Sequence, residues 1–295
     1  VFSPTYNFTK VKKFVKKIPY TYADNANAVK GYVQGFYTTS LSETRDDDYN
    51  LTTQFLADYI KSFGKHGITA MIGYEDFYQK WEYLDASRDQ YELTNFPYLN
   101  LGPETYRDNS GSATEYAYRS IFGRLTYSFA NRYLVQGNFR RDGSSRFASD
   151  NRWGNFPSFS AGWIISEEPF FKKMHAAWFD FLKLRASWGT LGNERIGSYY
   201  PYQAAIGFNN VLFLNGGDVS SLTAAAQAIY AVRNITWETT ESWNIGFDAA
   251  FFKNRLTVGF DYYKKITKDM LLSLEIPKFV GYDNPSVNTG NMSTR

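Results

Sequence analysis

The fold is indicated by the stretch Tyr133-Leu134-Val135-Gln136-Gly137-Asn138-Phe139-Arg140. Apart from Gly137, its odd positions carry apolar or aromatic side chains, whereas its even positions after Leu134 carry Gln, Asn and Arg. Successive side chains of a β-strand point to opposite faces of the sheet. The stretch therefore predicts a strand with one apolar and one polar face.

The same alternation recurs along the chain. It is clear at residues 158–165, 182–189, 242–251 and 256–263, and weaker at 49–62, 68–80 and 116–130. A soluble β-sandwich would also alternate, but its strands are usually about five or six residues long. Several of these segments are longer, and their polar faces repeatedly carry Gly, Ser and charged residues, so the pattern favours a membrane barrel over a sandwich.

The connections between the predicted strands alternate in length. They are tight at Phe63–Gly67, Asn131-Arg132 and Lys253–Arg255, intermediate at 143–152 and 271–290, and long at about 81–115 and 196–240. Short turns at one rim and long loops at the other are typical of outer-membrane barrels. The sequence therefore predicts an all-β fold, a transmembrane antiparallel β-barrel. Residues 1–295 form part of a single barrel domain in this interpretation, and the two long connections are its extracellular loops.

The composition agrees with a barrel and excludes other classes. Aromatic residues make up 19% of the chain, as expected for a protein with aromatic girdles at the membrane interfaces. The absence of cysteine excludes disulfides, thiolate zinc sites and thiol nucleophiles. A net charge of +3 gives no indication of a nucleic-acid partner. The chain has no apolar run of the roughly 18 to 20 residues that a membrane-spanning helix needs.

The sequence gives no indication of an active site. Neither His66 nor His175 has metal ligands at a suitable spacing, and no Gly-x-Ser-x-Gly motif accompanies them. The run Asp46-Asp47-Asp48 lacks the spacing of a calcium loop and is interpreted as a solvated loop tip. We therefore expect no enzyme, no metal and no cofactor. Residues 167–171 predict a short helical turn at the periplasmic rim.

Three groups of motifs identify a family. The first is Arg140-Arg141-Asp142-Gly143-Ser144-Ser145-Arg146-Phe147, followed by Asn151–Gly154 and Phe156–Ser158. The second is Leu182–Gly189 with Gly192-Asn193, and the third combines Trp237-Glu238, Asn244–Asp248 and Phe260–Tyr263. In this order they resemble the SusC/RagA family of TonB-dependent outer-membrane transporters of Bacteroidota.

The resemblance implies import of an oligosaccharide or peptide across the bacterial outer membrane. It implies a 22-stranded barrel, of which this chain would supply eight or nine strands, and a SusD-like surface lipoprotein as a lid. The family's TonB box, plug domain and final strand have no counterpart here, so the TonB complex would act through the missing part. The chain begins and ends abruptly, at Val1–Pro4 and Asn291–Arg295, and its ends are interpreted as those of a fragment or of a partly covered polypeptide. A siderophore or cobalamin receptor, a soluble carbohydrate-binding or hydrolytic β-domain and a passive porin remain alternatives.

Aromatic side chains in the two long loops are the candidates for substrate contact, because sugars stack on ring faces. They are Trp81, Tyr83, Tyr91, Phe96, Tyr98 and Tyr106 in the first loop and Tyr199, Tyr200, Tyr202, Phe208 and Phe213 in the second. The alternative is that these rings pack a loop onto itself or onto the lid. Arg140 is a further candidate, for contact with substrate or anionic lipopolysaccharide, but an ion-pair network with Arg141, Asp142 and Arg146 that rigidifies the loop is the favoured explanation.

The polar faces of the predicted strands have a different expected role. Their inward side chains would hydrate the lumen and contact the plug; they are Gln136, Asn138, Arg140, Lys183, Arg185, Asn244 and Asp248. The basic run from Lys10 to Lys17 is interpreted as a strand end and loop near lipid phosphates in the outer membrane.

Overall fold

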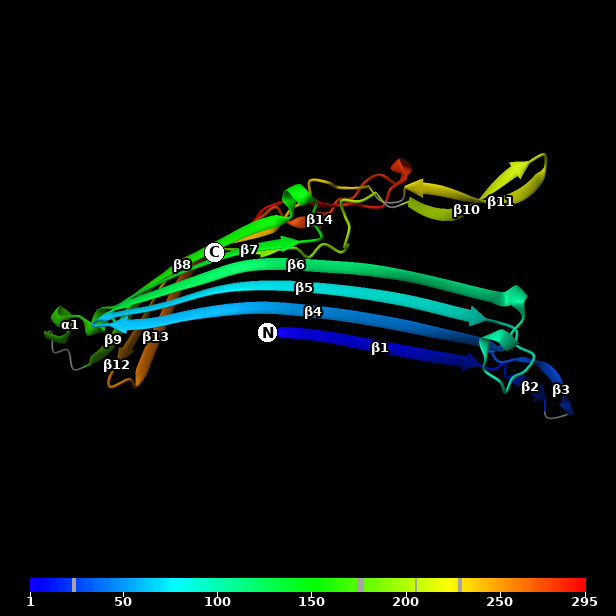
Figure 1. Ribbon diagram of the computed structural model, residues 1–295, viewed down its shortest axis with the longest axis horizontal. Helices are drawn as coiled ribbons and strands as arrows, with labels where there is room; N and C mark the ends of the chain where they lie inside the picture. The colour runs from blue at the N-terminus through cyan, green and yellow to red at the C-terminus, as the bar shows by residue number, and fades with distance from the viewer. Residues whose placement is uncertain (23–24, 174–177, 205, 228–229) are drawn as a thin grey trace. The chain divides into compact units, whose positions relative to one another are not determined.

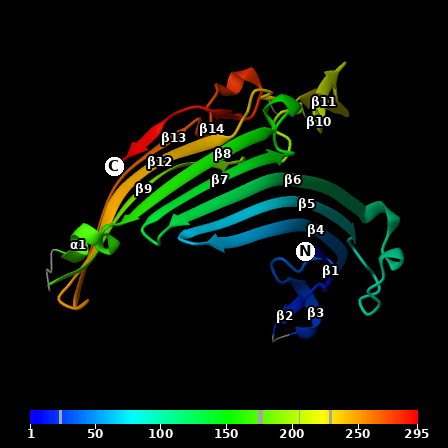
Figure 2. The same cartoon turned by 60° about the vertical axis from the view of Figure 1, so that its left-hand side comes forward.

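The computed structural model describes residues 1–22, 25–173, 178–204, 206–227 and 230–295, so His175 lies outside the described residues. Its main sheet has ten strands in the order β1-β4-β5-β6-β7-β8-β9-β12-β13-β16 (Figures 1 and 2). They are β1 (Phe2–Val15), β4 (Ser40–Phe63), β5 (His66–Arg88), β6 (Arg107–Phe129), β7 (Tyr133–Ser144), β8 (Trp153–Ile164), β9 (Phe179–Asn193), β12 (Glu238–Phe251), β13 (Leu256–Lys268) and β16 (Met292–Thr294).

The predicted all-β antiparallel fold is confirmed. Neighbouring strands from β6 to β13 pair antiparallel, with Val135 opposite Ala161 and Ile245 opposite both Ala186 and Tyr262. The sheet has ten strands rather than the expected eight or nine. β1 ends at Val15, so the basic run from Lys10 to Lys17 lies at a strand end and in the connection after it, as expected.

The three tight turns are also confirmed. They use backbone conformations with positive φ at Gly64 (58°), Asn131 (56°) and Asn254 (61°), which Gly and Asn adopt at low cost. The connection after β8 contains the 3-10 helix η4 (Ile165–Glu167) and the short helix α1 (Pro169–Lys173), as the sequence predicted. No helix in the described part of the chain is long and apolar enough to span a membrane.

The first predicted long connection is shorter than expected, whereas the second, residues 194–237, has about the expected length. Residues 81–88 continue β5 and residues 107–115 belong to β6, so the first connection is 89–106, with the 3-10 helices η1 (Leu99–Leu101) and η2 (Glu104–Tyr106). The second contains a hairpin of β10 (Ile206–Asn215) and β11 (Asp218–Gln227). The apolar and polar alternation fades in these segments although strand pairing continues. A strand beyond the membrane has no lipid on either face, so its sequence need not alternate.

The chain divides into two compact units. The first contains Val1, residues 53–76 and residues 116–295; the second contains residues 2–52 and 77–115. The division cuts across the three longest strands, β4, β5 and β6, which have 24, 23 and 23 residues. The shorter strands β7, β8, β9, β12 and β13, with 12 to 15 residues, lie wholly in the first unit. A barrel strand crosses the membrane in about 9–11 residues. The ends of β4, β5 and β6 nearest the tight turns belong to the first unit, and their remaining lengths belong to the second.

The two faces of the sheet in the first unit differ as the alternation predicted. Phe159 is 57% exposed and Ile245 is 64% exposed on one face. Apolar side chains so exposed in strand after strand indicate a face that contacts lipid. The opposite face pairs Gln136 with Ser160 and Asn138 with Ser158, so it is the polar face of a barrel wall.

Candidate functional site

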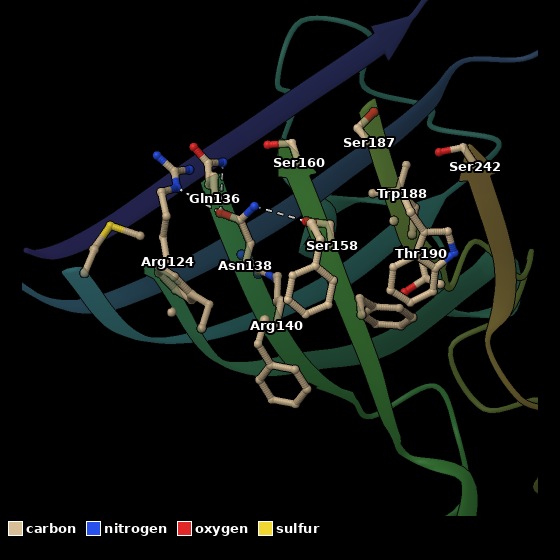
Figure 3. A pocket seen from close by; sticks show the side chains of 18 residues that line it. Arg124, Gln136, Asn138, Arg140, Ser158, Ser160, Ser187, Trp188, Thr190 and Ser242 are labelled. Carbon is tan, nitrogen blue, oxygen red and sulfur yellow. Dashed lines mark hydrogen bonds between the residues drawn. The ribbon is translucent and has the colours of Figure 1, made fainter. Parts of the chain in front are cut away.

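The polar face of β6 to β12 forms what we call the inner polar wall: Arg124, Gln136, Asn138, Ser158, Ser160, Ser187 and Ser242. Figure 3 shows these side chains projecting from adjacent strands into one hollow. Asn138 is its centre, since its Oδ1 accepts from Arg124 Nε at 3.0 Å and Gln136 Nε2 at 3.3 Å. Its Nδ2 donates to Ser158 Oγ at 3.1 Å. These hydrogen bonds hold the long side chains against the wall.

The hollow in front of this wall has a volume of about 570 Å³. Small residues create it, because Ser158, Ser160, Ser187 and Gly189 occupy adjacent positions on β8 and β9. The wall therefore offers hydroxyls and amides over a broad surface rather than a closed pocket. Such a surface suits contact with a large polar object. The predicted inward residues Gln136, Asn138 and Arg140 all line it.

A buried aromatic core holds the connections at the opposite end of the strands from the tight turns. It contains Phe147, Phe156, Ile196, Val232, Ile235 and Trp237. The Trp237 ring lies 5.1 Å from that of Phe147 and 5.4 Å from that of Phe156, and its Nε1 donates to the Arg152 carbonyl oxygen at 3.1 Å. The connections 145–152 and 194–237 are thereby fixed to each other and to β8.

An arginine between two tyrosines lies beside this core, in a group that we call the rim cluster: Tyr116, Arg146, Glu194 and Tyr199. The Arg146 guanidinium carbon is 4.8 Å from the Tyr116 ring centroid and 5.1 Å from that of Tyr199. Arg146 Nη1 donates to the Glu194 carbonyl oxygen at 3.3 Å, and the Tyr116 hydroxyl donates to Glu194 Oε1. Both cation–π contacts and the hydrogen bonds orient these side chains.

The rim cluster keeps hydrogen-bonding capacity. In the part of the chain that the structure describes, Arg146 Nε and Glu194 Oε2 are buried and have no hydrogen-bond partner. An incoming polar group could satisfy a donor and an acceptor here.

Arg140 lies in the ion-pair network that was the alternative to a ligand contact. Its Nε is 2.7 Å and 2.9 Å from the two carboxylate oxygens of Asp142, and its Nη2 donates to Ser120 Oγ at 2.8 Å. The guanidinium carbon also lies 5.1 Å from the Phe122 ring centroid. These contacts commit Arg140 to the wall of the sheet and favour a structural role.

Trp81 and Tyr83 form an aromatic pair in the second unit. Both lie on β5 rather than in a loop, which corrects the sequence interpretation. Their ring centroids are 5.9 Å apart with planes 13° from parallel, and Trp81 Nε1 donates to Asp46 Oδ1 at 2.6 Å. Both side chains are half-buried. We call Trp81, Tyr83 and Asp46 the aromatic platform.

The other predicted rings lie in different surroundings. Tyr91 is 2% exposed and its hydroxyl donates to the Leu99 carbonyl oxygen at 3.3 Å, so the ring packs the connection onto itself, which favours the alternative to a ligand contact. Tyr98 is exposed, with Lys12 Nζ 4.9 Å from its ring centroid, and Tyr106 is exposed in η2. Tyr199 and Tyr200 have ring centroids 6.5 Å apart. The remaining candidates are Tyr202, which is half-buried, and Phe96, Phe208 and Phe213, which are exposed.

The three consecutive aspartates are not a loop tip, because they lie within β4. Asp46 accepts from Trp81, whereas Asp47 accepts from the Tyr6 hydroxyl at 2.5 Å and Asp48 from Gln79 Nε2 at 3.0 Å. Each carboxylate thus has its own partner. Throughout the described ranges, no three His, Cys, Asp or Glu side chains come close enough together to hold a metal ion.

Sequence reasoning did not identify Tyr116 and Glu194 as site residues. They are 78 positions apart, and no local pattern indicates that a strand residue and a loop residue will meet. Arg146 carried a signal, because it lies within a motif already identified at 140–147. The stacking of Arg146 on two tyrosines could be seen only in the structure.

Comparison with known proteins agrees with this architecture. The family model described as TonB dependent receptor-like, beta-barrel, matches residues 3–295. The chain is 37% identical over 230 residues to TonB-dependent receptor SusC of Bacteroides thetaiotaomicron, covering 78% of this chain and 22% of the relative. It is 34% identical over 251 residues to TonB-dependent receptor P39 of Formosa agariphila, covering 84% of this chain and 23% of the relative.

A solved structure gives the same picture. The chain superposes on a protein chain in the structure of the RagAB peptide transporter with a TM-score of 0.79 and 26% sequence identity. The superposition covers 99% of this chain and 30% of the transporter chain. The chain thus spans about a quarter of the length of the curated relatives described above. These relatives are receptors and transporters by name, and receptors of this type are outer-membrane β-barrels. The chain belongs to the TonB-dependent receptor β-barrel family, and its strands form part of such a barrel in the bacterial outer membrane.

Proposed function

We propose that this chain is part of the wall of an active importer that takes up an oligosaccharide or a peptide across the outer membrane in a TonB-dependent manner. The observation that carries the proposal is the 37% identity to the TonB-dependent receptor SusC. The similarity in structure to a chain of the RagAB peptide transporter supports it. The two long connections would face the cell exterior, and residues 1–295 would belong to one barrel domain.

The partners follow from the same relationship. A SusD-like surface lipoprotein would close over the barrel as a lid, and the TonB complex would supply energy through a plug domain. The inner polar wall supports contact with a plug, because its small residues and amides offer a broad hydrogen-bonding surface. The wall itself stays rigid in this mechanism.

Substrate contact is assigned to two groups of side chains. One is the aromatic platform, where Asp46 fixes the Trp81 ring and Tyr83 extends the stacking surface. The other is the rim cluster together with Tyr200 and Tyr202. Tyr98 and Tyr106 are exposed enough to take part. A sugar ring stacks on such surfaces and a peptide can hydrogen bond beside them.

The experiment is uptake of fluorescently labelled oligosaccharides and peptides by cells that express the intact protein. Uptake should stop when an uncoupler removes the proton gradient; continued uptake would identify a passive porin instead. Co-purification of a surface lipoprotein with the intact protein tests the lid, and its absence would favour a receptor without one.

A matched pair of variants tests the platform. Trp81→Ala removes the stacking surface, whereas Trp81→Phe keeps a ring but removes the hydrogen bond to Asp46. An aromatic contact is worth about 0.5–1.5 kcal/mol, so Trp81→Ala should weaken binding by about two- to tenfold. Equal binding by the wild type and Trp81→Ala would remove Trp81 from the site.

A further inference from the structure

The consecutive residues Arg140 and Arg141 lie on opposite faces of β7. Successive side chains of a strand alternate between its faces, so Arg140 lies on the side of the inner polar wall, whereas Arg141 shares the lipid-facing side with Phe139. Arg141 is directly opposite Ile121 of β6 and is exposed, as are Ile121 at 46% and Phe139 at 49%. The alternation therefore separates Arg141 from the ion pairs that Arg140 makes on the other face.

The position of Arg141 along β7 places it at the outer edge of the apolar band. At the other end of this strand, the Tyr133 hydroxyl donates to Glu168 Oε1 at 2.6 Å, and Glu168 lies in the connection between η4 and α1. Tyrosine concentrates where hydrocarbon meets water, so Tyr133 marks the periplasmic interface. Arg141 follows Tyr133 by eight positions, which is about 27 Å along a strand. At a tilt of about 35–45° this is about 20 Å of depth, close to the height of an apolar band of about 25 Å.

An indole ring supports the Arg141 guanidinium on this face. Trp153 of β8 lies opposite Gly143, and its ring covers this glycine, because a Cβ at Gly143 would lie 2.8 Å from Trp153 Cε3. The Arg141 guanidinium carbon is 5.2 Å from the centroid of the Trp153 ring. A contact between a cation and a ring face orients the guanidinium without using its N–H groups as hydrogen-bond donors to a carboxylate. These N–H groups therefore remain for an acceptor outside the sheet.

The charge around Arg141 is positive. Within the described ranges, no carboxylate oxygen lies within 4.0 Å of the Arg141 guanidinium. Arg119 of β6 lies on the same face, opposite Gly143, and its Nε is 2.9 Å from Asp76 Oδ1. Two arginines and one aspartate leave this surface with a net positive charge. At the edge of the hydrocarbon, an anionic headgroup stabilises such a charge.

We propose that Arg141, supported by Trp153, binds a phosphate group of lipopolysaccharide in the outer leaflet of the outer membrane. A guanidinium forms two parallel hydrogen bonds to a phosphate, which gives the contact a defined geometry. The acyl chains would lie along Phe139 and Phe159, which share the lipid-facing side with Arg141 and lie nearer the middle of the strands. Lipopolysaccharide carries its phosphates directly above its acyl chains, so a cation above apolar rings matches both parts. This binding is independent of what the importer transports.

Native mass spectrometry of the intact protein in detergent tests the proposal. The probes are lipid A, which is the phosphorylated and acylated part of lipopolysaccharide, and the same lipid A with its phosphates removed, added separately. The wild type should bind the phosphorylated form more tightly. Arg141→Gln should raise the apparent Kd for this form about fivefold, which is the effect of one cation near an anionic lipid surface, and leave the Kd for the dephosphorylated form nearly unchanged. Arg141→Lys keeps the charge but loses the planar pair of donors, so its Kd should lie between those of the wild type and Arg141→Gln.

Lys265→Gln is the matched control, because Lys265 of β13 lies on the other face of the sheet, opposite Ser242. It also removes one positive charge and should change the Kd for phosphorylated lipid A by less than about twofold. Wild-type affinity in Arg141→Gln would overturn the proposal, and so would an equal loss in Lys265→Gln or equal affinity of the wild type for the two forms of lipid A. Equally tight, Arg141-dependent binding of phosphatidylglycerol would overturn it in favour of a general phospholipid site. Each variant is first checked for the wild-type difference in migration before and after boiling.

Discussion

The substitution Gly192→Ala tests how the buried aromatic core holds the connections at the end of the barrel wall. A Cβ at position 192 would lie 2.1 Å from Cζ and 2.5 Å from Cε1 of Phe156. Carbon atoms in contact need about 3.5 Å, so the ring must move by more than about 1 Å. Phe156 is buried against Trp237, which leaves it little room.

The expected cost of Gly192→Ala is about 1–3 kcal/mol, the range for adding a methyl group to a packed core. It is measured as the loss in free energy of unfolding of the intact protein, or as a lower temperature at which the unboiled form loses its distinct migration. Gly197→Ala is the matched control, because a Cβ there would meet nothing within 4 Å. It should leave stability nearly unchanged.

A double variant makes the test specific. Phe156→Leu shortens the ring that meets position 192, so Gly192→Ala in the Phe156→Leu background should cost less than it does in the wild type. Equal stability of Gly192→Ala and Gly197→Ala would refute the reasoning. Strictly additive effects of Gly192→Ala and Phe156→Leu would also refute it, since the two sites would then not be in contact.

Three further predictions concern single side chains. Hydrogen bonds from Tyr133, Trp163 and Arg132 hold the pKa of Glu168 below its ordinary value of 4.5. The resulting stabilisation is complete above that ordinary value and is lost as pH falls below it, through the folded-state pKa. Glu168→Gln should therefore flatten the loss of thermal stability on acidification below about pH 4.5. A wild-type slope in Glu168→Gln would contradict this. Arg146→Lys removes the planar group between Tyr116 and Tyr199 and should cost about 1–2 kcal/mol in the free energy of unfolding, whereas no loss would show that the two ring contacts contribute nothing. Tyr91→Phe should leave substrate uptake unchanged because the ring is buried, and a specific loss of uptake with unchanged stability would restore Tyr91 as a ligand contact.

The sequence determined the fold class because lipid imposes a pattern on it. Where one face of a strand meets hydrocarbon and the other meets water, side chains must alternate, and the segments at 133–140 and 242–251 do so. The tight turns could also be predicted, as short breaks between alternating segments, although Ala130, Phe252 and Lys253 adopt positive φ there beside the Gly and Asn residues. The order of the motifs then indicated the family that the comparisons confirmed.

Strand length beyond the membrane could not be predicted in the same way. The parts of β5 and β6 at 81–88 and 107–115 alternate weakly, although the strands continue through them. The two segments were therefore interpreted as a loop. As a result, Trp81 and Tyr83 were placed in a loop although they lie on β5.

Only the tertiary structure decided which polar and aromatic side chains meet. Tyr116 and Glu194 meet because a strand and a connection that are distant in sequence lie side by side, and Arg146 then stacks between Tyr116 and Tyr199. Lys65 and Arg132 line one hollow because β5 and β6 bring two turns together. Alternation within a strand reports which face a side chain takes, but the residue opposite it depends on register, and register depends on the pairing of whole strands.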